Sequence, residues 1–256
     1  MNTQITFSLE DLEKQQNLLE SVTSTYRCKS QQDDVMRKLC VRAFEPWLKK
    51  TTYNGLEIGC SDGQMTAMFS SLLNRLDVVE ATESFLKKVE ARQLNNVTLH
   101  HSMIEQFNNG TKYDCIFATW VLTHFLDAQL ALKHIKNFLT TDGLLFITVP
   151  NVRVLSRQLA LHMGLIDDLY KLTANDRNHG HVRSYDRQRL NNELDIAGFE
   201  CISQGGLMLK ILADYQMDTL YENEILGNEH IEGFFKLGNE YPDLASAIYC
   251  VCRVKK

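Results

Sequence analysis

The sequence predicts an α/β fold in which a mostly parallel sheet of seven strands carries helices on both faces. Short apolar runs alternate with segments of helical periodicity after residue 50, which is the pattern of repeated βαβ units. The run at 144–149 is apolar almost throughout, as expected for a strand at the covered centre of a parallel sheet. With 256 residues, 44% of them hydrophobic, the chain is long enough for one large domain with its own core.

The first half of the chain supplies most of the expected strands. Apolar residues recur at helical spacing over about residues 9–48, which predicts an N-terminal helical segment. Short apolar runs that end at polar or glycine-containing loops predict strands at 56–58, 76–80, 97–99, 113–118 and 144–149. Helical spacing between them predicts helices at 65–73, 85–94 and 128–139, and Asp142-Gly143 is expected to turn the chain into the 144–149 strand.

The regular alternation of strand and helix patterns stops after residue 150. An amphipathic stretch and a polar run over about residues 151–184 predict an inserted helical lid followed by a loop. The remaining pattern predicts a helix at 188–197 capped by Gly198, apolar segments near 199–202 and 207–212, more helix at 217–240 and a last strand at 247–252.

Two regions follow from this organisation. We expect an N-terminal helical cap over residues 1–50 and a domain over residues 51–256 that contains the lid. The cap and the lid should cover the carboxyl end of the sheet and shape a binding pocket there. The N-terminal helix could instead be an oligomer contact, so a homodimer stays open.

Charge and cysteine content exclude several classes of partner. The chain has 27 Lys and Arg against 32 Asp and Glu, a net charge of −5, so no basic excess favours nucleic acid. The N-terminus lacks the features of a signal peptide, and no run approaches the roughly 18 apolar residues of a membrane span. The seven cysteines form no CxxC pair and no metal-ligand spacing. We therefore expect no membrane insertion, no metal ion and a cytoplasmic location.

The loop after the first strand has the pattern of a nucleoside-cofactor site. Gly59-Cys60-Ser61-Asp62-Gly63 follows a strand and opens a helix, and open α/β sheets bind ligands at the carboxyl ends of strands. Glu80 ends the next strand, 21 residues after Gly59, where it can accept two ribose hydroxyls. A dinucleotide site needs G-x-G-x-x-G for its pyrophosphate, but positions 61 and 64 are Ser and Gln. S-adenosylmethionine has no phosphate, so the loop favours that cofactor over a nicotinamide.

Residues 56–63, Leu-Glu-Ile-Gly-Cys-Ser-Asp-Gly, resemble the first motif of class I S-adenosylmethionine-dependent methyltransferases. Later segments match the family in order. Residues 79–82 resemble the ribose-binding acid, 101–105 the loop beside the adenine, 113–124 the fourth motif, and 139–151 the fifth strand and its exit. The resemblance covers about residues 50–205 and implies a Rossmann-like fold, S-adenosylmethionine as cofactor and methyl transfer.

The resemblance also implies which residues hold the cofactor. Glu57, Gly59 and Thr119 would hold the methionine moiety, Glu80 the ribose, and Met103 and Ile104 the adenine. Further cofactor contacts are expected from their motif neighbours Cys60, Ser61, Gly63, Ala81, Ser102 and Trp120. Two positions depart from the family pattern: Ser61 replaces the middle glycine, and Thr123 precedes His124 where many relatives have Glu.

Three histidines are candidates for catalysis. Methyl transfer to a hydroxyl needs a base that removes the proton, and histidine suits that task near neutral pH. His181 and His179 lie in the polar loop after the lid, and His124 follows a strand end. We expect His181 to lie near the site, with the alternative that it fastens its loop by hydrogen bonds to the backbone.

Arg183, Tyr185 and Asn151 are the expected acceptor-binding residues. An arginine fork suits carboxylate or phosphate, while an ion pair of Arg183 with a carboxylate of a neighbouring helix is an equal alternative. The run 178–185, with 197–199 beyond it, is similar to a Gly-His-x-Arg-x-Tyr…Ala-Gly-Phe run of a small-molecule methyltransferase branch. The tail is similar to methyltransferases found with carbohydrate-modifying and surface-glycan enzymes.

Together these patterns predict methyl transfer from S-adenosylmethionine to a small-molecule acceptor. The leading acceptor is a hydroxyl of a sugar or nucleotide-linked sugar, with a histidine as general base. Methylation of a carboxylate or amine of a small or carrier-bound metabolite is the alternative. A nicotinamide oxidoreductase would use the same Gly59 loop and Glu80, and a protein that binds the cofactor without transferring the methyl group is a further alternative.

Overall fold

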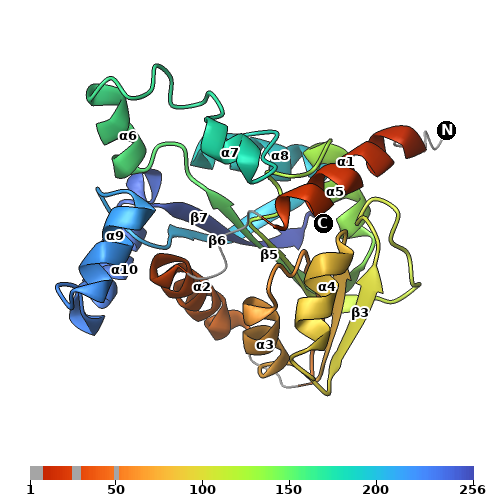
Figure 1. Cartoon of the computed structure of the whole chain (residues 1–256). Coiled ribbons are helices and arrows are strands. Elements are labelled where there is room, and N and C mark those ends of the chain that lie inside the picture. The colour runs from red at the N-terminus through yellow and green to blue at the C-terminus, as the bar shows by residue number, and fades with distance from the viewer. Residues whose placement is uncertain (1–7, 25–29, 49–51) are drawn as a thin grey trace.

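The computed structural model describes residues 8–24, 30–48 and 52–256. Its centre is a seven-stranded sheet in the order β3-β2-β1-β4-β5-β7-β6, in which only β7 runs against its neighbours (Figure 1). The strands are β1 (Asn54–Ile58), β2 (Arg75–Glu80), β3 (Val97–His101), β4 (Tyr113–Thr119), β5 (Leu139–Pro150), β6 (Phe199–Gly206) and β7 (Ala247–Val254). The predicted Rossmann-like fold, a seven-stranded and mostly parallel sheet, is confirmed.

Helices cover the two faces of the sheet. On one face α5 (Ala128–Lys136) and α8 (Arg187–Ala197) pack on the side chains of Ile116 and Ile147. On the other face lie α2 (Gln31–Phe44), α3 (Gln64–Ser70) and α4 (Glu83–Glu90). Alternate residues of β4 belong to opposite faces, and both are buried. This explains why the central strands read as continuous apolar runs.

The central aromatic contacts fix the second face. Phe117 of β4 stacks on Phe69 of α3 with ring centroids 3.9 Å apart, and on Phe146 of β5 at 5.1 Å. Phe44 of α2 meets Phe146 edge-on at 5.0 Å. Since aromatic pairs of this kind stabilise beyond their buried area, α2 and α3 are held in fixed positions beside the carboxyl ends of β1 and β4.

The cap elements are α1 (Leu9–Val22), α6 (Leu155–His162), α7 (Ala174–Asn178), α9 (Asp214–Glu222) and α10 (Asn228–Glu240), with short 3-10 turns η1 (Glu45–Trp47) and η2 (Pro242–Leu244). The N-terminal segment contains two helices, each with a serine N-cap: Ser8 for α1 and Ser30 for α2. Within the described ranges, no helix is both long enough and apolar enough to cross a membrane.

One expectation about an element was wrong. Asp142-Gly143 does not turn the chain before the strand, because it lies inside β5, where the pairing with β4 shifts register. The helix expected at 217–240 is present as two helices, since Asn223 ends α9 and Gly227 begins α10. The apolar segment 207–212 lies beyond the sheet, which ends at Gly206, and the backbone of this segment bonds to α10 and to Ser246.

Candidate functional site

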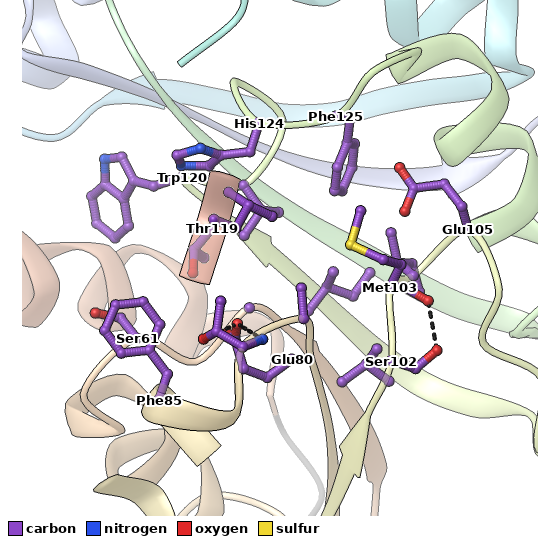
Figure 2. A pocket seen from close by; sticks show the side chains of 18 of the residues that line it. Ser61, Glu80, Phe85, Ser102, Met103, Glu105, Thr119, Trp120, His124 and Phe125 are labelled. Carbon is purple, nitrogen blue, oxygen red and sulfur yellow. Dashed lines mark hydrogen bonds between the residues drawn. The ribbon is translucent and has the colours of Figure 1, made fainter. Parts of the chain in front are cut away.

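The first cavity lies at the carboxyl ends of β1, β2 and β4, where the strand order reverses (Figure 2). In a doubly wound sheet this is the place where a ligand binds. The cap closes it, because Leu19 and Val22 of α1 are part of its lining. Two hydrogen bonds hold α1 there: Gln15 Nε2 donates to the carbonyl of His124 and Gln16 Nε2 to that of Ala81, each at 2.8 Å.

The loop after β1 has a backbone that two glycines make possible. Gly59 has φ +73°, and a Cβ there would lie 2.5 Å from Cγ1 of Val121. Gly63 has φ +76°, and a Cβ there would lie 2.8 Å from Val89. Both left-handed conformations and both close approaches exclude larger side chains. The loop therefore packs directly against the loop after β4.

Glu80 connects the loop to the end of β2. Its Oε2 accepts a hydrogen bond from the backbone N–H of Cys60 at 2.9 Å. Its Oε1 accepts from the backbone N–H and the hydroxyl of Thr82, at 2.9 and 2.8 Å. The carboxylate is thus held in one orientation at the cavity wall, and its remaining lone pairs suit the two hydroxyls of a ribose.

The other end of the cavity fits an adenine. Met103 and Ile104 are buried and contribute apolar lining. Glu105 lines the cavity beside them (Figure 2), and among the described residues neither of its buried carboxylate oxygens has a hydrogen-bond partner. Burial raises the pKa of Glu105. An exocyclic amine would supply the missing donor, so the residues fit the adenosyl group that the sequence resemblance implies.

Nine of the predicted cofactor residues line this cavity: Gly59, Ser61, Glu80, Ala81, Ser102, Met103, Ile104, Thr119 and Trp120. The other three, Glu57, Cys60 and Gly63, are not among its lining residues. Glu57 is buried at the end of β1, and burial together with the nearby charge of Glu80 raises its pKa to about 8. The sequence gives no hint that Glu57 sits beneath the loop.

A second, larger cavity of about 520 Å³ adjoins the first. Trp120, His124 and His179 belong to the lining of both. Trp120 has φ +59°, a conformation unusual for a bulky residue, and its backbone N–H donates to the carbonyl of Thr148 at 2.7 Å. Strained residues of this kind cluster at functional sites, and this one stands at the junction of the two cavities.

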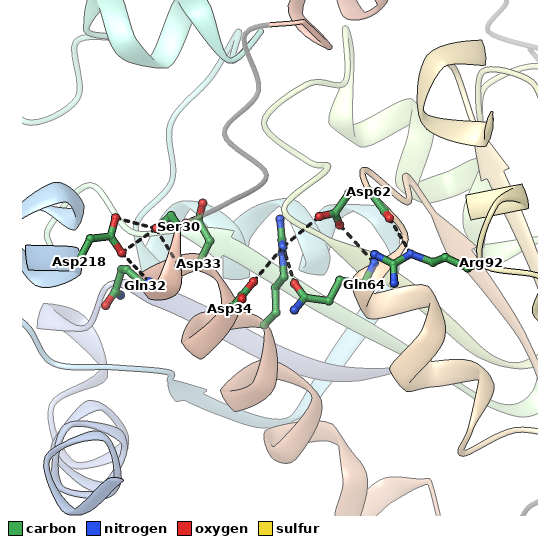
Figure 3. A network of polar contacts seen from close by, with 9 residues as sticks. Ser30, Gln32, Asp33, Asp34, Asp62, Gln64, Arg92 and Asp218 are labelled. Carbon is green, nitrogen blue, oxygen red and sulfur yellow. Dashed lines mark hydrogen bonds and ion pairs between the residues drawn. The ribbon is translucent and has the colours of Figure 1, made fainter. Parts of the chain in front are cut away.

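The walls of the second cavity come from the cap, the lid and the exit of β5. Helix α2 contributes Asp33 and Arg37, and the lid contributes Arg157 and Asp176. Arg37 donates to Gln64 at 2.5 Å and pairs with Asp62 at 3.5 Å. These contacts fasten α2 to the loop after β1 and the start of α3 (Figure 3). Most of the lining carries hydroxyl, amide, carboxylate or cationic groups, so the cavity suits a polar molecule.

The three predicted histidines meet at the junction. The ring centroids of His124 and His181 are 5.1 Å apart, and those of His179 and His181 are 6.3 Å apart. Burial, together with the neighbouring His181 charge, lowers the pKa of His124 to about 4, although its contact with the carbonyl of Gly180 opposes this. In the part of the chain that the structure describes, no group of His, Cys, Asp or Glu side chains could hold a metal ion.

The predicted acceptor residues line the second cavity, but their polar groups have protein partners. The Asn151 side-chain amide donates to the carbonyls of Asp243 and Ala245. The Tyr185 hydroxyl donates to Glu193 at 2.6 Å. One nitrogen of Arg183 donates to the carbonyls of residues 125 and 126, and another lies 3.8 Å from Glu193 of α8. This geometry favours the alternative that Arg183 pairs with a helix carboxylate.

Sequence reasoning missed several lining residues. They are Leu19, Val22, Phe85, Glu105 and Phe125 in the first cavity, and Asp33, Asp176 and Lys210 in the second. Glu105 stood inside a matched motif segment and could have been found as an acid in the adenine loop. The others belong to no motif, because they reach the cavities through the packing of helices and loops from separate parts of the chain.

Comparison with models of protein families shows which family the chain belongs to. Residues 29–204, more than half of the chain, match the model of a methyltransferase domain family. The chain belongs to this methyltransferase family. The match includes the loop after β1, the strands β1 to β5 and the lid. The predicted resemblance is confirmed.

Curated relatives match over shorter stretches. Nodulation protein S of Azorhizobium caulinodans is 33% identical over 98 residues, which is 37% of this chain and 47% of that protein. (S)-coclaurine N-methyltransferase of Papaver somniferum is 27% identical over 118 residues, 44% of this methyltransferase and 32% of the relative. The chain thus spans less than half the length of the curated relatives it matches.

Solved structures share the fold over nearly the whole chain. The N-methyltransferase NodS from Bradyrhizobium japonicum, in complex with S-adenosyl-L-homocysteine, has a TM-score of 0.57 at 14% identity, covering 96% of this methyltransferase and 98% of NodS. A DhpI complex with SAM and HEP has a TM-score of 0.62 at 13% identity, covering 97% and 100%.

Proposed function

We propose that this methyltransferase transfers the methyl group of S-adenosylmethionine to a hydroxyl of a sugar or nucleotide-linked sugar, with a histidine at the cavity junction taking up the hydroxyl proton. The observation that carries the proposal is the second cavity. It adjoins the cofactor cavity, and its walls present polar groups from every side. Its volume lies in the range of small-molecule sites.

The residues of the first cavity have defined tasks in this proposal. Glu80 binds the ribose hydroxyls, Met103 and Ile104 enclose the adenine, and Glu105 accepts a hydrogen bond from its amine. The cofactor supplies an electrophilic methyl group on a sulfonium. Leu19 and Val22 of α1 exclude water from that side of the cavity, which favours charge transfer between the reacting atoms.

The second cavity positions the acceptor. Trp120 and His124 separate the two cavities only partly, since both line each of them, so an acceptor hydroxyl can approach the methyl group there. Holding the two reactants in line supplies much of the rate of a displacement. We therefore assign acceptor choice to α2, α6 and α7, which form the outer walls.

The test is an acceptor screen. The full chain is incubated with S-adenosylmethionine labelled in the methyl group and with a panel of monosaccharides, nucleotide sugars, and amine and carboxylate compounds of similar size. We expect labelled product, one methyl group heavier, with a hydroxyl-bearing sugar or nucleotide sugar. Transfer only to amines or only to carboxylates would refute the hydroxyl acceptor.

An amine acceptor is the second candidate. It is favoured by relatives whose names include N-methyltransferase, and by three carboxylates in the second cavity, Asp33, Asp176 and Asp214, that could attract an ammonium. The same screen separates the two candidates when each sugar is paired with its amino analogue. An amine product would replace the hydroxyl proposal and leave the cofactor assignment unchanged.

A further inference from the structure

We infer that His181 is the base that receives the acceptor proton, and that Asp176 is the residue that positions it. The inference rests on the proposed methyl transfer and says which of the three histidines acts. Nδ1 of His181 lies 3.7 Å from Oδ1 of Asp176, and both side chains line the second cavity. A base oriented by a carboxylate is a recurring arrangement in enzymes that activate a hydroxyl.

The carboxylate of Asp176 is itself held in place. Its Oδ2 accepts from the backbone N–H and the hydroxyl of Thr173, each at 2.8 Å, and from Arg157 at 3.2 Å. Burial alone would raise the pKa of Asp176, but the contacts with His181, Thr173 and Arg157 hold it well below its usual range. Asp176 therefore stays ionised, and its other oxygen remains directed at the imidazole.

This arrangement favours one tautomer of His181. The negative charge of Asp176, 3.7 Å from Nδ1, favours the form in which Nδ1 of His181 carries the proton and Nε2 carries the lone pair. The negative charge of Asp176 stabilises the imidazolium that forms when Nε2 takes a proton. The other charged or titratable groups near His181 are His124 after β4, His179 after α7 and, on the far side of Asp176, Arg157 of α6.

His124 lacks this partner, since its Nδ1 lies 3.1 Å from the carbonyl of Gly180. His179 Nδ1 lies 2.8 Å from the carbonyl of Asn175, and its ring interacts electrostatically with Asp33 of α2 rather than with Asp176. A neutral carbonyl fixes the tautomer but does little to stabilise a positive ring. His124 is also half-buried, and burial disfavours its charged form. It can accept a hydrogen bond from another hydroxyl of the acceptor, while His181 takes the proton of the hydroxyl that is methylated.

The chemical step balances without a further reactant. A lone pair of the acceptor oxygen forms the new bond to the methyl carbon as the carbon–sulfur bond breaks, and that electron pair neutralises the sulfonium. The hydroxyl proton passes to Nε2 of His181, which later releases it to water. No oxidant, reductant or metal ion takes part.

The first test needs no acceptor. The full chain with S-adenosylhomocysteine and ¹⁵N-labelled histidine is examined by NMR at one fixed pH, as wild type and as Asp176→Asn. We expect His181 of the wild type to show the Nδ1–H tautomer, and this preference to weaken in the variant, because a charge 3.7 Å away is lost. An unchanged tautomer would overturn the positioning role of Asp176.

Thr173→Ala is the matched control. It removes a hydroxyl that caps α7 and binds Asp176, but it leaves the carboxylate beside His181. We expect a small loss of thermal stability and a nearly unchanged His181 tautomer. If Thr173→Ala changes the tautomer as much as Asp176→Asn does, the effect is structural and the inference fails.

The second test uses the acceptor found in the screen. His181→Asn should lower kcat at least 100-fold with KM for S-adenosylmethionine unchanged, while His124→Asn, which can still donate to Gly180, should lose less than 10-fold. A larger loss in His124→Asn than in His181→Asn would overturn the assignment. Absence of any transfer by the wild type would count against the proposed function, while the NMR result would still decide the role of Asp176.

Discussion

At the scale of single residues, the conformation of Gly59 limits what the cofactor loop tolerates. The residue combines a φ of +73° with a Cβ position only 2.5 Å from Val121. Gly110 has nearly the same φ, +70°, but nothing lies within 4 Å of its Cβ position. Comparing alanine substitutions at the two glycines therefore separates the free-energy cost of backbone strain from that of steric overlap.

We expect Gly59→Ala to destabilise the protein by about 3 kcal/mol, since strain and overlap add, and Gly110→Ala by about 1 kcal/mol from strain alone. Urea unfolding of both variants measures this difference. Gly59→Ala should also weaken binding of S-adenosylhomocysteine, whereas Gly110→Ala should not. Equal costs for the two substitutions would show that the contact with Val121 relaxes freely.

Asp33 makes the stability of the folded protein depend on pH, and its pKa shift determines the direction of that dependence. Burial and the neighbouring charges of Asp214 and Asp218 raise its pKa to about 6, although Arg37 opposes them. A carboxyl group whose pKa is raised on folding favours the folded state when protonated. Its stabilising effect is complete below the ordinary value of 3.8 and is lost as pH rises through about 6.

Asp33→Asn should therefore unfold at a higher temperature than the wild type at pH 8, by an amount that corresponds to about 1 kcal/mol after allowance for solvent screening. The advantage should shrink as pH falls through 6 and vanish near pH 4. Asp34→Asn, on the same helical turn, should gain nothing, because Asp34 lies 3.5 Å from Arg37. A gain at pH 8 in both variants would point to helix propensity instead.

At the scale of elements, α2 connects the cap to the cofactor loop. Arg37 is buried and bonds to Gln64 and Asp62, while Ser30 and the N–H of Gln32 at the start of the helix donate to Asp218 of α9 (Figure 3). One helix thus joins the loop after β1, to which we assign the cofactor, to the wall of the second cavity.

Arg37→Met should cost about 2 kcal/mol of stability, because it leaves Asp62 without its cation and frees the loop. Its binding of S-adenosylhomocysteine, measured by calorimetry, should weaken about 10-fold. Arg42→Met on the same helix is the control, since the Arg42–Glu232 pair is solvent-exposed and should contribute little to stability. Similar losses in both variants would contradict an anchoring role for Arg37.

At the scale of the whole molecule, the cofactor cavity couples ligand binding to stability. A ligand that binds only the folded state at 100 times its Kd adds about 2.7 kcal/mol. For a domain of this size that corresponds to a rise in Tm of roughly 5–10 °C. S-adenosylhomocysteine and S-adenosylmethionine should each raise Tm in this way, and NAD and NADP should not. Stabilisation by a nicotinamide nucleotide alone would make Glu80 a dehydrogenase residue.

Much of the geometry of the candidate cofactor site could be predicted from the sequence because its determinants are local. Gly59 and Gly63 mark a turn that only glycine allows, and apolar runs of period two and helical spacing place that turn between β1 and α3. Glu80 ends the neighbouring strand, and parallel pairing brings the ends of β1 and β2 together. Each of these features depends on residues close in sequence.

The residues that line the second cavity could not be predicted from the sequence, because the tertiary structure brings them together. Asp33 and Arg37 reach it through packing of α2 on the sheet, and the lid adds Asp176 through a capped helix of five residues. No periodic pattern records which wall a polar side chain faces. For the same reason, Arg183 and Asn151 stood out in the sequence as acceptor residues, while the fold uses their polar groups on backbone carbonyls.

The sequence by itself therefore determined the fold class, the cofactor loop and the methyltransferase family of this protein, because backbone conformation and hydrophobic periodicity are written in neighbouring residues. Only the tertiary structure decided that α1 closes the first cavity, that α2 and the lid form the second, and that Asp176 stands beside His181 rather than beside His124. Those contacts join segments far apart in the chain, and packing fixes them.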